Sequence, residues 1–373
     1  MPANPVGLNF RASDTRPMSA RHIFATCLYL GFIAGVACAC FRRPVPDDFD
    51  RYIYEALVRG KYDSVETVYP IVKHSNRRAE ESSVLDSSTH LGQLEPLYAI
   101  KPLYVRAIEA TAFTRLPIQS RINLISALSL FGIGIVVLGW TGRPGYSALL
   151  LATSTVVILG RMGTPDGLSA LIILAGLWAL SQNRLLIGIL LMLASIWLRT
   201  DNLLLVVAVV GYLLWQKRMT WVDATVISAL SIGSVELINH FSGNYGWRVL
   251  FQYSFLGGRS PAEVVPHFGL REYLGVVAHS AETIIPEVAI WILLGIVAWK
   301  WSSPYRGWLI PVWLAVIAHF ALFPSSELRY LIWALIVTGV TFVCAISNPA
   351  GARCQPWTAI LSKDEADILA RTG

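Results

Sequence analysis

Three carboxylates lie close together early in the chain, in the stretch PVPDDFDRYIYEAL from Pro44 to Leu57. Asp47, Asp48 and Asp50 directly follow the first hydrophobic run, so we expect them beside a membrane boundary. At helical spacing, Asp47 and Asp50 share one face, and Asp48 lies on the next. A carboxylate fixed there could act as general base toward a substrate held in the lipid headgroup layer.

The same stretch also fits a plain helix start. Pro46 precedes Asp47, which could serve as the N-cap, and the other two acids would complement the helix dipole. From this stretch alone, both interpretations stay open.

The composition excludes a soluble globular protein. The chain has 373 residues, of which 54% are hydrophobic and 14% charged, and its mean hydropathy is +0.54. A soluble domain cannot bury that much apolar surface. The net charge of +6 suits cytoplasmic loops facing anionic lipid. There is no compact basic patch, so nucleic acid is not an expected partner. The five cysteines lack metal-ligand spacing.

The apolar runs predict an all-α polytopic membrane protein with about ten transmembrane helices. We expect a cytoplasmic tail over 1–21, a membrane domain over 22–347 and a second cytoplasmic tail over 348–373. Two long extracytoplasmic loops, 42–117 and 239–286, should carry amphipathic surface helices. The predicted spans are Ile23–Phe41, Ile118–Trp140, Tyr146–Gly160, Leu168–Leu180, Leu185–Leu198, Leu203–Trp215, Trp221–Ile238, Val288–Trp301, Trp308–Phe323 and Tyr330–Ile346.

The charges support this arrangement. The short connections assigned to the cytoplasm carry six basic residues and no carboxylate, as the positive-inside rule requires. They are Arg143, Arg184, Lys217, Arg218, Lys300 and Arg306. Charged residues at the other ends of the spans gather on the extracytoplasmic face. If Leu168–Leu198 were one broken helix, the sidedness beyond it would be reversed.

Six motifs together resemble the GT-C superfamily, the multi-span glycosyltransferases that use polyprenyl-phosphate-linked sugars. The protein O-mannosyltransferase and lipid A aminoarabinose transferase branch is the most similar. The motifs are DDFDRYIYEAL, YAIKPLY, SRINLISALSL, RMGTPDGLSALI, LRTDNLLL and ELRYLIWAL. One departs from the family pattern, because Leu103 follows Lys101-Pro102 where Lys-Pro-Pro is common.

The resemblance implies an inverting single displacement on the outer face of a multi-pass membrane protein, in a bacterial cytoplasmic (inner) membrane with the site facing the periplasm. Asp47 or Asp48 would be the base, with Asp48 slightly behind and Asp50 a helix-start residue. Lys101, Arg199 and Arg329 would bind the donor phosphate, since a departing phosphate needs cations rather than a general acid. Alternatively, Lys101 is a snorkelling lysine, and the arginines pair with Asp201 and Glu327.

Five further residues are candidate substrate contacts: Tyr54, Asp166, Tyr245, Trp247 and Tyr330. Asp166 could equally stabilise a helix N-terminus, and the aromatic residues could form a membrane-interface belt. Some GT-C enzymes bind a divalent cation, and the three acids make Mg²⁺ or Mn²⁺ a candidate cofactor. No histidine lies nearby, and the metal is left unassigned.

The expected partners are a polyprenyl-phosphate-linked sugar, a lipid, glycan or protein acceptor, and the bilayer. No Gly-rich phosphate loop follows a strand, which disfavours a nucleotide-sugar donor. A transporter or flippase is the main alternative, but it should show mid-span charges and inverted repeats. Asp223 and Glu236 are the partial exceptions here. A membrane O-acyltransferase would need a catalytic histidine within a span, and His319 is its one candidate.

Overall fold

The computed structural model describes residues 20–45, 48–61, 63–75, 86–257, 260–301, 303 and 305–347. Every regular element in these ranges is helical, without a strand, which confirms the all-α prediction. Asp47 lies outside the described residues, as do the whole of the expected tail 348–373 and most of the tail 1–21.

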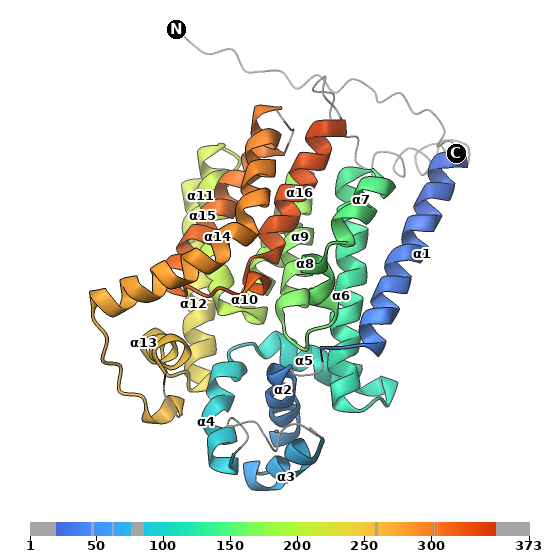
Figure 1. Ribbon diagram of the computed structural model, residues 1–373. Helices are drawn as coiled ribbons and strands as arrows, with labels where there is room; N and C mark the ends of the chain where they lie inside the picture. The colour runs from blue at the N-terminus through green and yellow to red at the C-terminus, as the bar shows by residue number, and fades with distance from the viewer. Residues whose placement is uncertain are drawn as a thin grey trace.

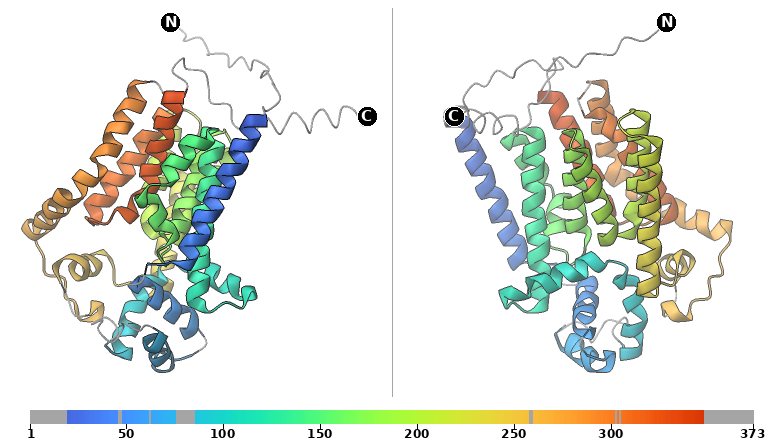
Figure 2. Two further views of the ribbon diagram at one scale, coloured as in Figure 1. Left: turned by 45° about the vertical axis from the view of Figure 1, so that its right-hand side comes forward. Right: turned by 180° about the vertical axis from the view of Figure 1, so that it is seen from behind.

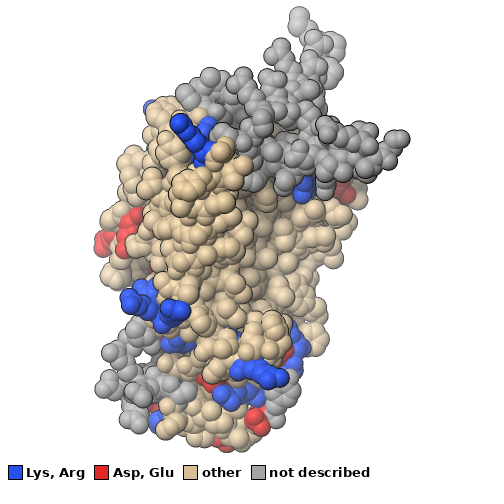
Figure 3. Space-filling view, turned by 90° about the vertical axis from the view of Figure 1, so that its right-hand side faces the viewer, with Lys and Arg blue, Asp and Glu red and all other residues tan. Residues whose placement is uncertain are grey.

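Within the described part of the chain, four helices are long and apolar enough to cross a membrane, which indicates a membrane protein by length and composition. They are α1 (Ala20–Arg42), α6 (Ile118–Thr141), α12 (Trp221–Ser242) and α14 (Leu270–Lys300). Figure 1 shows α1, α6 and the second half of α14 in one bundle. On the face drawn in Figure 3, uncharged residues cover most of the middle, and charged side chains gather near the lower end.

Five shorter apolar helices complete the bundle, each below the ~20 residues that a lone span needs. They are α9 (Asp166–Ser181), α10 (Leu185–Leu198), α11 (Leu203–Trp215), α15 (Leu309–Leu322) and α16 (Ile332–Ser347). α9 packs between α6 and α10, α11 packs against α15, and α16 packs against α14. The count of about ten spans therefore stays a prediction.

The expected span over 146–160 is not one continuous helix. It divides into α7 (Pro144–Leu151), α8 (Ser154–Val157) and η4 (Ile158–Gly160). The break falls at Thr153, whose backbone is extended and whose hydroxyl donates to the Leu150 carbonyl. A side-chain bond of this kind competes with helix continuation.

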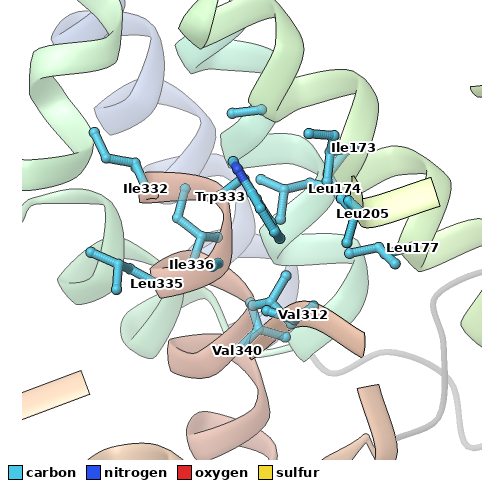
Figure 4. Packing of buried hydrophobic residues seen from close by; sticks show 14 of the residues in the cluster. Ile173, Leu174, Leu177, Leu205, Val312, Ile332, Trp333, Leu335, Ile336 and Val340 are labelled. Carbon is cyan, nitrogen blue, oxygen red and sulfur yellow. The ribbon is translucent and has the colours of Figure 1, made fainter. Parts of the chain in front are cut away.

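The bundle core lies around α16, which is buried on nearly all sides. A helix that is hydrophobic all round belongs in the interior of a bundle. Figure 4 shows α16 packing against neighbours from three other helices. The labelled residues are Ile332, Trp333, Leu335, Ile336 and Val340 of α16, with Ile173, Leu174 and Leu177 of α9, Leu205 of α11 and Val312 of α15.

Four helices of the first long loop form a small layer at one end of the bundle, here called the cap. They are α2 (Phe49–Gly60), α3 (Val65–Ser75), α4 (Ser88–Ala99) and α5 (Pro102–Ala110). Ile53, Val72, Leu91 and Leu94 are buried at its centre. Figures 1 and 2 show the cap at the opposite end from the Ala20 end of α1 and the Ser347 end of α16.

The second long loop holds the short helix α13 (Trp247–Phe251), which Figure 1 shows between the cap and the start of α14. Because α14 begins at Leu270 and continues through Pro286, the last part of the expected 239–286 loop is helical. Short 3-10 or π segments complete the connections: η3 Thr111–Thr114, η5 Thr200–Asn202, η6 Gln252–Leu256, η7 Pro261–Glu263, η8 Arg306–Trp308 and η9 Leu328–Tyr330.

Candidate functional site

Ionisable side chains from five connections meet where the cap joins the bundle. We call this set the junction cluster. α2 and its N-cap supply two members, and the others come from the α4–α5 junction, the start of α9, the α10–α11 connection and η9. Its members are Asp48, Asp50, Lys101, Asp166, Arg199, Asp201 and Arg329.

Asp50 joins the cap to the bundle. Arg329 Nη1 donates to Asp50 Oδ2 at 2.7 Å, and the Tyr98 hydroxyl donates to Asp50 Oδ1 at 2.6 Å. Burial alone would raise the pKa of Asp50, but the Arg329 charge and the Tyr98 hydrogen bond outweigh it and hold the pKa below its usual value. Asp50 is therefore a poor general base, and both of its carboxylate oxygens already accept hydrogen bonds. Its position in the first turn of α2 agrees with its expected helix-start role.

Arg199 is engaged by two carboxylates. Its Nε and Nη2 donate to the two carboxylate oxygens of Asp201 at 3.1 and 2.7 Å, and its Nη1 pairs with Asp166. Arg329 likewise pairs with Glu327 in addition to Asp50. The Arg199–Asp201 and Arg329–Glu327 ion pairs, which the sequence analysis gives as the alternative to phosphate binding, are therefore both present.

Tyr330 brings the two arginines together. Arg199 Cζ lies 4.6 Å from the centroid of the Tyr330 ring, and Arg329 Cζ lies 5.0 Å from it. Arg329 Nη2 also donates to the Tyr330 hydroxyl at 3.1 Å. Asp166, the first residue of α9, lies near both guanidinium groups, with its Oδ2 4.0 Å from Arg329 Nε. The sequence prediction placed these residues at one face, and the structure brings them into contact.

Lys101 differs from the arginines because no described carboxylate lies within ion-pair distance of its ammonium. Its Nζ donates to the Leu97 carbonyl at 3.4 Å and lies 4.7 Å and 5.8 Å from the ring centroids of Tyr98 and Tyr54. Burial lowers the pKa of Lys101 to about 8. The Tyr54 hydroxyl beside it is buried without a hydrogen-bond partner among the described residues. Lys101 and Tyr54 thus offer donors to a ligand.

Asp48 takes the N-cap position of α2, which corrects the expected N-cap at Asp47. Its side chain does not bond to its own helix and instead accepts the backbone N–H of Gly163. Burial, and then the nearby charge of Asp50, raise the pKa of Asp48 to about 6. Only glycine fits opposite it, because a Cβ on Gly163 would lie 2.8 Å from Arg51 Cβ and 3.1 Å from Asp48 Oδ2.

Two expected substrate contacts lie outside the junction cluster. The Tyr245 hydroxyl donates to the Gln93 carbonyl of α4 at 3.1 Å, and Trp247 Nε1 donates to the Leu322 carbonyl of α15 at 2.6 Å. These bonds attach the second loop to the cap and to the bundle. Asp223, weighed earlier as a near mid-span charge, belongs to the capping box at the start of α12 with Thr220.

An open pocket of about 340 Å³ lies beside Arg329. It runs between α8–η4 on one side and η9–α16 on the other. Four of its eight lining residues are apolar, and the other four supply two hydroxyls and the Glu327–Arg329 ion pair. Its lining residues are Ser154, Thr155, Ile158, Met162, Glu327, Leu328, Arg329 and Ile332.

The cluster does not fit a divalent cation. Among the residues that the structure describes, no group of three His, Cys, Asp or Glu side chains is arranged to hold a metal. The carboxylates of Asp50, Asp166 and Asp201 are already paired with arginine, and Asp48 accepts a backbone N–H.

The charge balance decides what the cluster can bind. Its three cations face four carboxylates, so an added anion must displace a carboxylate from an arginine or bind at Lys101. Sequence reasoning missed Tyr98 as a partner of Asp50, although Tyr98 lies in the YAIKPLY motif.

No family model, curated protein or solved structure matches this chain.

Proposed function

We propose that this chain is an integral-membrane glycosyltransferase. It moves a sugar from a polyprenyl-phosphate donor to an acceptor hydroxyl, with inversion, on the extracytoplasmic face. One observation carries the proposal: a carboxylate with a raised pKa, Asp48, belongs to the same cluster as the Lys101 ammonium, which has no described carboxylate within ion-pair distance. A transfer from a lipid phosphate needs both, one to accept a proton and one to stabilise the leaving group.

Asp48 supplies the base. A pKa of about 6 keeps most of its carboxylate ionised at neutral pH while making it a stronger proton acceptor than an ordinary aspartate. Its Oδ2 accepts the Gly163 N–H, which fixes the carboxylate and leaves its second oxygen for an acceptor hydroxyl. The hydroxyl oxygen would attack the anomeric carbon as its proton moves to Asp48, and the bond to the phosphate oxygen would break. Asp47, which the sequence analysis places slightly ahead of Asp48, is the other candidate from the same motif and lies outside the described residues.

The leaving phosphate would be held by Lys101 and the two arginines. Lys101 offers an ammonium with no described carboxylate within ion-pair distance. Arg199 and Arg329 both contact Asp166, so a phosphate could take the place of that carboxylate between the two guanidinium groups. Guanidinium forks bind phosphate and carboxylate with the same bidentate geometry.

The pocket beside Arg329 suits a lipid phosphate. Four of its lining residues are apolar, and Arg329 adds a cation to the lining. An isoprenoid chain would lie against the apolar residues with its phosphate toward the arginine. We place this end of the bundle outside a bacterial inner membrane, because the basic connections predicted as cytoplasmic lie at the other ends of the helices.

Comparison of cells with and without the gene tests the proposal. We expect loss of one envelope glycan or glycolipid modification and accumulation of its polyprenyl-phosphate sugar, both measured by mass spectrometry. A transporter would instead leave an unchanged lipid-linked sugar on one side of the membrane. An unchanged glycan profile with an altered lipid sidedness would contradict the glycosyltransferase.

Lys101→Ala should weaken binding of farnesyl phosphate, a short prenyl phosphate, by about tenfold or more, because a charge-assisted hydrogen bond is lost. In the parent chain this affinity should fall as the pH rises above about 8, since Lys101 is protonated below its pKa of about 8 and neutral above it. The variant should lose that pH dependence. Both are measured by titration of the detergent-purified chain.

Lys73→Ala is the matched control, since Lys73 also lies over a tyrosine ring, 5.5 Å from the centroid of Tyr69, but outside the junction cluster. It should bind farnesyl phosphate like the parent chain. Equal affinity in Lys101→Ala and the parent would show that Lys101 is a structural snorkelling lysine.

A further inference from the structure

His319 is a partly buried ionisable residue that the proposed mechanism does not use. It lies in the last turn of α15, and the packing of α15 on α11 brings it to the start of the latter helix. There, His319 Nδ1 lies 3.1 Å from Asp201 Oδ2. A histidine can pack on an apolar helix without a carboxylate beside it. The His319–Asp201 pair is therefore a specific feature of this site.

The contact with Asp201 fixes the chemistry of the ring. A carboxylate accepts, so Nδ1 carries the proton and donates to Asp201, and in the neutral ring Nε2 is left as a hydrogen-bond acceptor. Nε2 itself is buried and has no partner among the described residues. A buried acceptor without a partner is unfavourable unless a ligand group completes it.

The surroundings of the ring connect it to the two arginines. The centroids of His319 and Tyr330 are 5.9 Å apart, and Tyr330 also lies against Arg199 and Arg329. Asp201 is shared between His319 and Arg199. Phe323 covers a further side of the imidazole, with a centroid distance of 6.3 Å. The His319 ring therefore borders the junction cluster, whose cations are proposed to hold the phosphate.

We infer that His319 is a sugar-binding residue whose Nε2 accepts a hydrogen bond from a hydroxyl of the donor sugar. The inference rests on the proposed function, because the anion that positions the sugar is the donor phosphate. Asp201 orients the imidazole and holds its tautomer. His319 thereby distinguishes a glycosylated lipid phosphate from the bare lipid phosphate that remains after transfer. Release of the sugar would remove this bond and favour exchange of the spent lipid.

The test compares two probes on the detergent-purified full chain. The first probe is farnesyl phosphate. The second is the glycosylated form that the parent chain binds best, chosen from farnesyl phosphates carrying mannose, glucose, galactose or arabinose. His319→Asn keeps a side-chain N–H near the position of Nδ1 for Asp201 but removes the acceptor at Nε2. We expect this variant to bind the best glycosylated probe about tenfold more weakly, while its affinity for farnesyl phosphate stays unchanged.

Two further variants make the result specific. His319→Gln places an amide oxygen near the position of Nε2 and should recover part of the lost affinity. His279→Asn changes an exposed histidine of α14 and should bind both probes like the parent chain. Thermal unfolding of each variant establishes that it is folded.

The outcomes separate the inference from the function on which it rests. Equal affinity of His319→Asn and the parent for the glycosylated probe, or an equal loss on both probes, overturns the role of His319 and leaves prenyl-phosphate binding in place. A parent chain that binds neither probe overturns the proposed function and the inference together.

Discussion

Asp48→Asn should lower sugar transfer by about 100-fold or more, because an amide cannot accept the proton of the acceptor hydroxyl. In the parent chain, transfer should be constant between about pH 7 and pH 8 and fall below about pH 6, as protonation of a carboxyl with a pKa of about 6 removes the base. The variant should show a flat, low profile over the same range. Transfer is measured with a prenyl-phosphate sugar in reconstituted membranes.

The control is Asp63→Asn, the same change at an exposed aspartate of the cap region. It should leave both the rate and the pH profile unaltered. Asp47→Asn, measured alongside, assigns the base between the two neighbouring acids of the motif. If Asp47→Asn, Asp48→Asn and the double variant all keep the parent activity, these acids serve only as helix-start residues.

Gly163→Ala tests Asp48 indirectly, by changing the residue whose backbone N–H donates to its carboxylate. The added methyl group would lie 3.1 Å from Asp48 Oδ2 and 2.8 Å from Arg51 Cβ, so the carboxylate or α2 must move. We expect a loss of transfer together with a destabilisation of about 1–3 kcal/mol, as is usual for overpacking. Gly145→Ala, where a Cβ has nothing within 4 Å, should show neither effect.

The second large effect concerns Arg329, which joins the cap to the bundle. Arg329→Met should lower the free energy of unfolding by about 3 kcal/mol or more, because it leaves the largely buried carboxylate of Asp50 without its cation. The double variant Arg329→Met/Asp50→Asn should recover part of that loss. Its amide removes the unpaired charge and still accepts the bond from Tyr98. Unfolding is followed in mixed detergent micelles.

Arg106→Met is the matched control, since Arg106 is an exposed arginine paired with Glu109 at 2.7 Å. Exposed pairs contribute little, so its effect should stay below about 1 kcal/mol. If Arg329→Met and Arg106→Met destabilise the chain equally, Arg329 does not hold the cap, and its charge is available for a ligand.

The sequence by itself determined the helices and the ends at which chemistry could occur. Runs such as 118–140 and 221–238 are local patterns. Their length and apolarity predict a helix without knowledge of the tertiary contacts. Asp166 and Arg199 were recognised as residues at helix ends for the same reason. The break at Thr153 was missed because an apolar run does not reveal a local side-chain bond to the backbone.

Only the tertiary structure decided which charges meet. Asp50 and Arg329 are 279 positions apart, and their contact depends on how the cap docks on the bundle rather than on any spacing along the chain. The N-cap of α2 is Asp48 rather than the expected Asp47. The Asp48 carboxylate accepts the Gly163 N–H from a loop that is distant in sequence. Likewise, His319 reaches Asp201 only through the packing of α15 on α11. Long-range packing sets these distances, and hence the pKa of Asp48 and the distance of Lys101 from every described carboxylate.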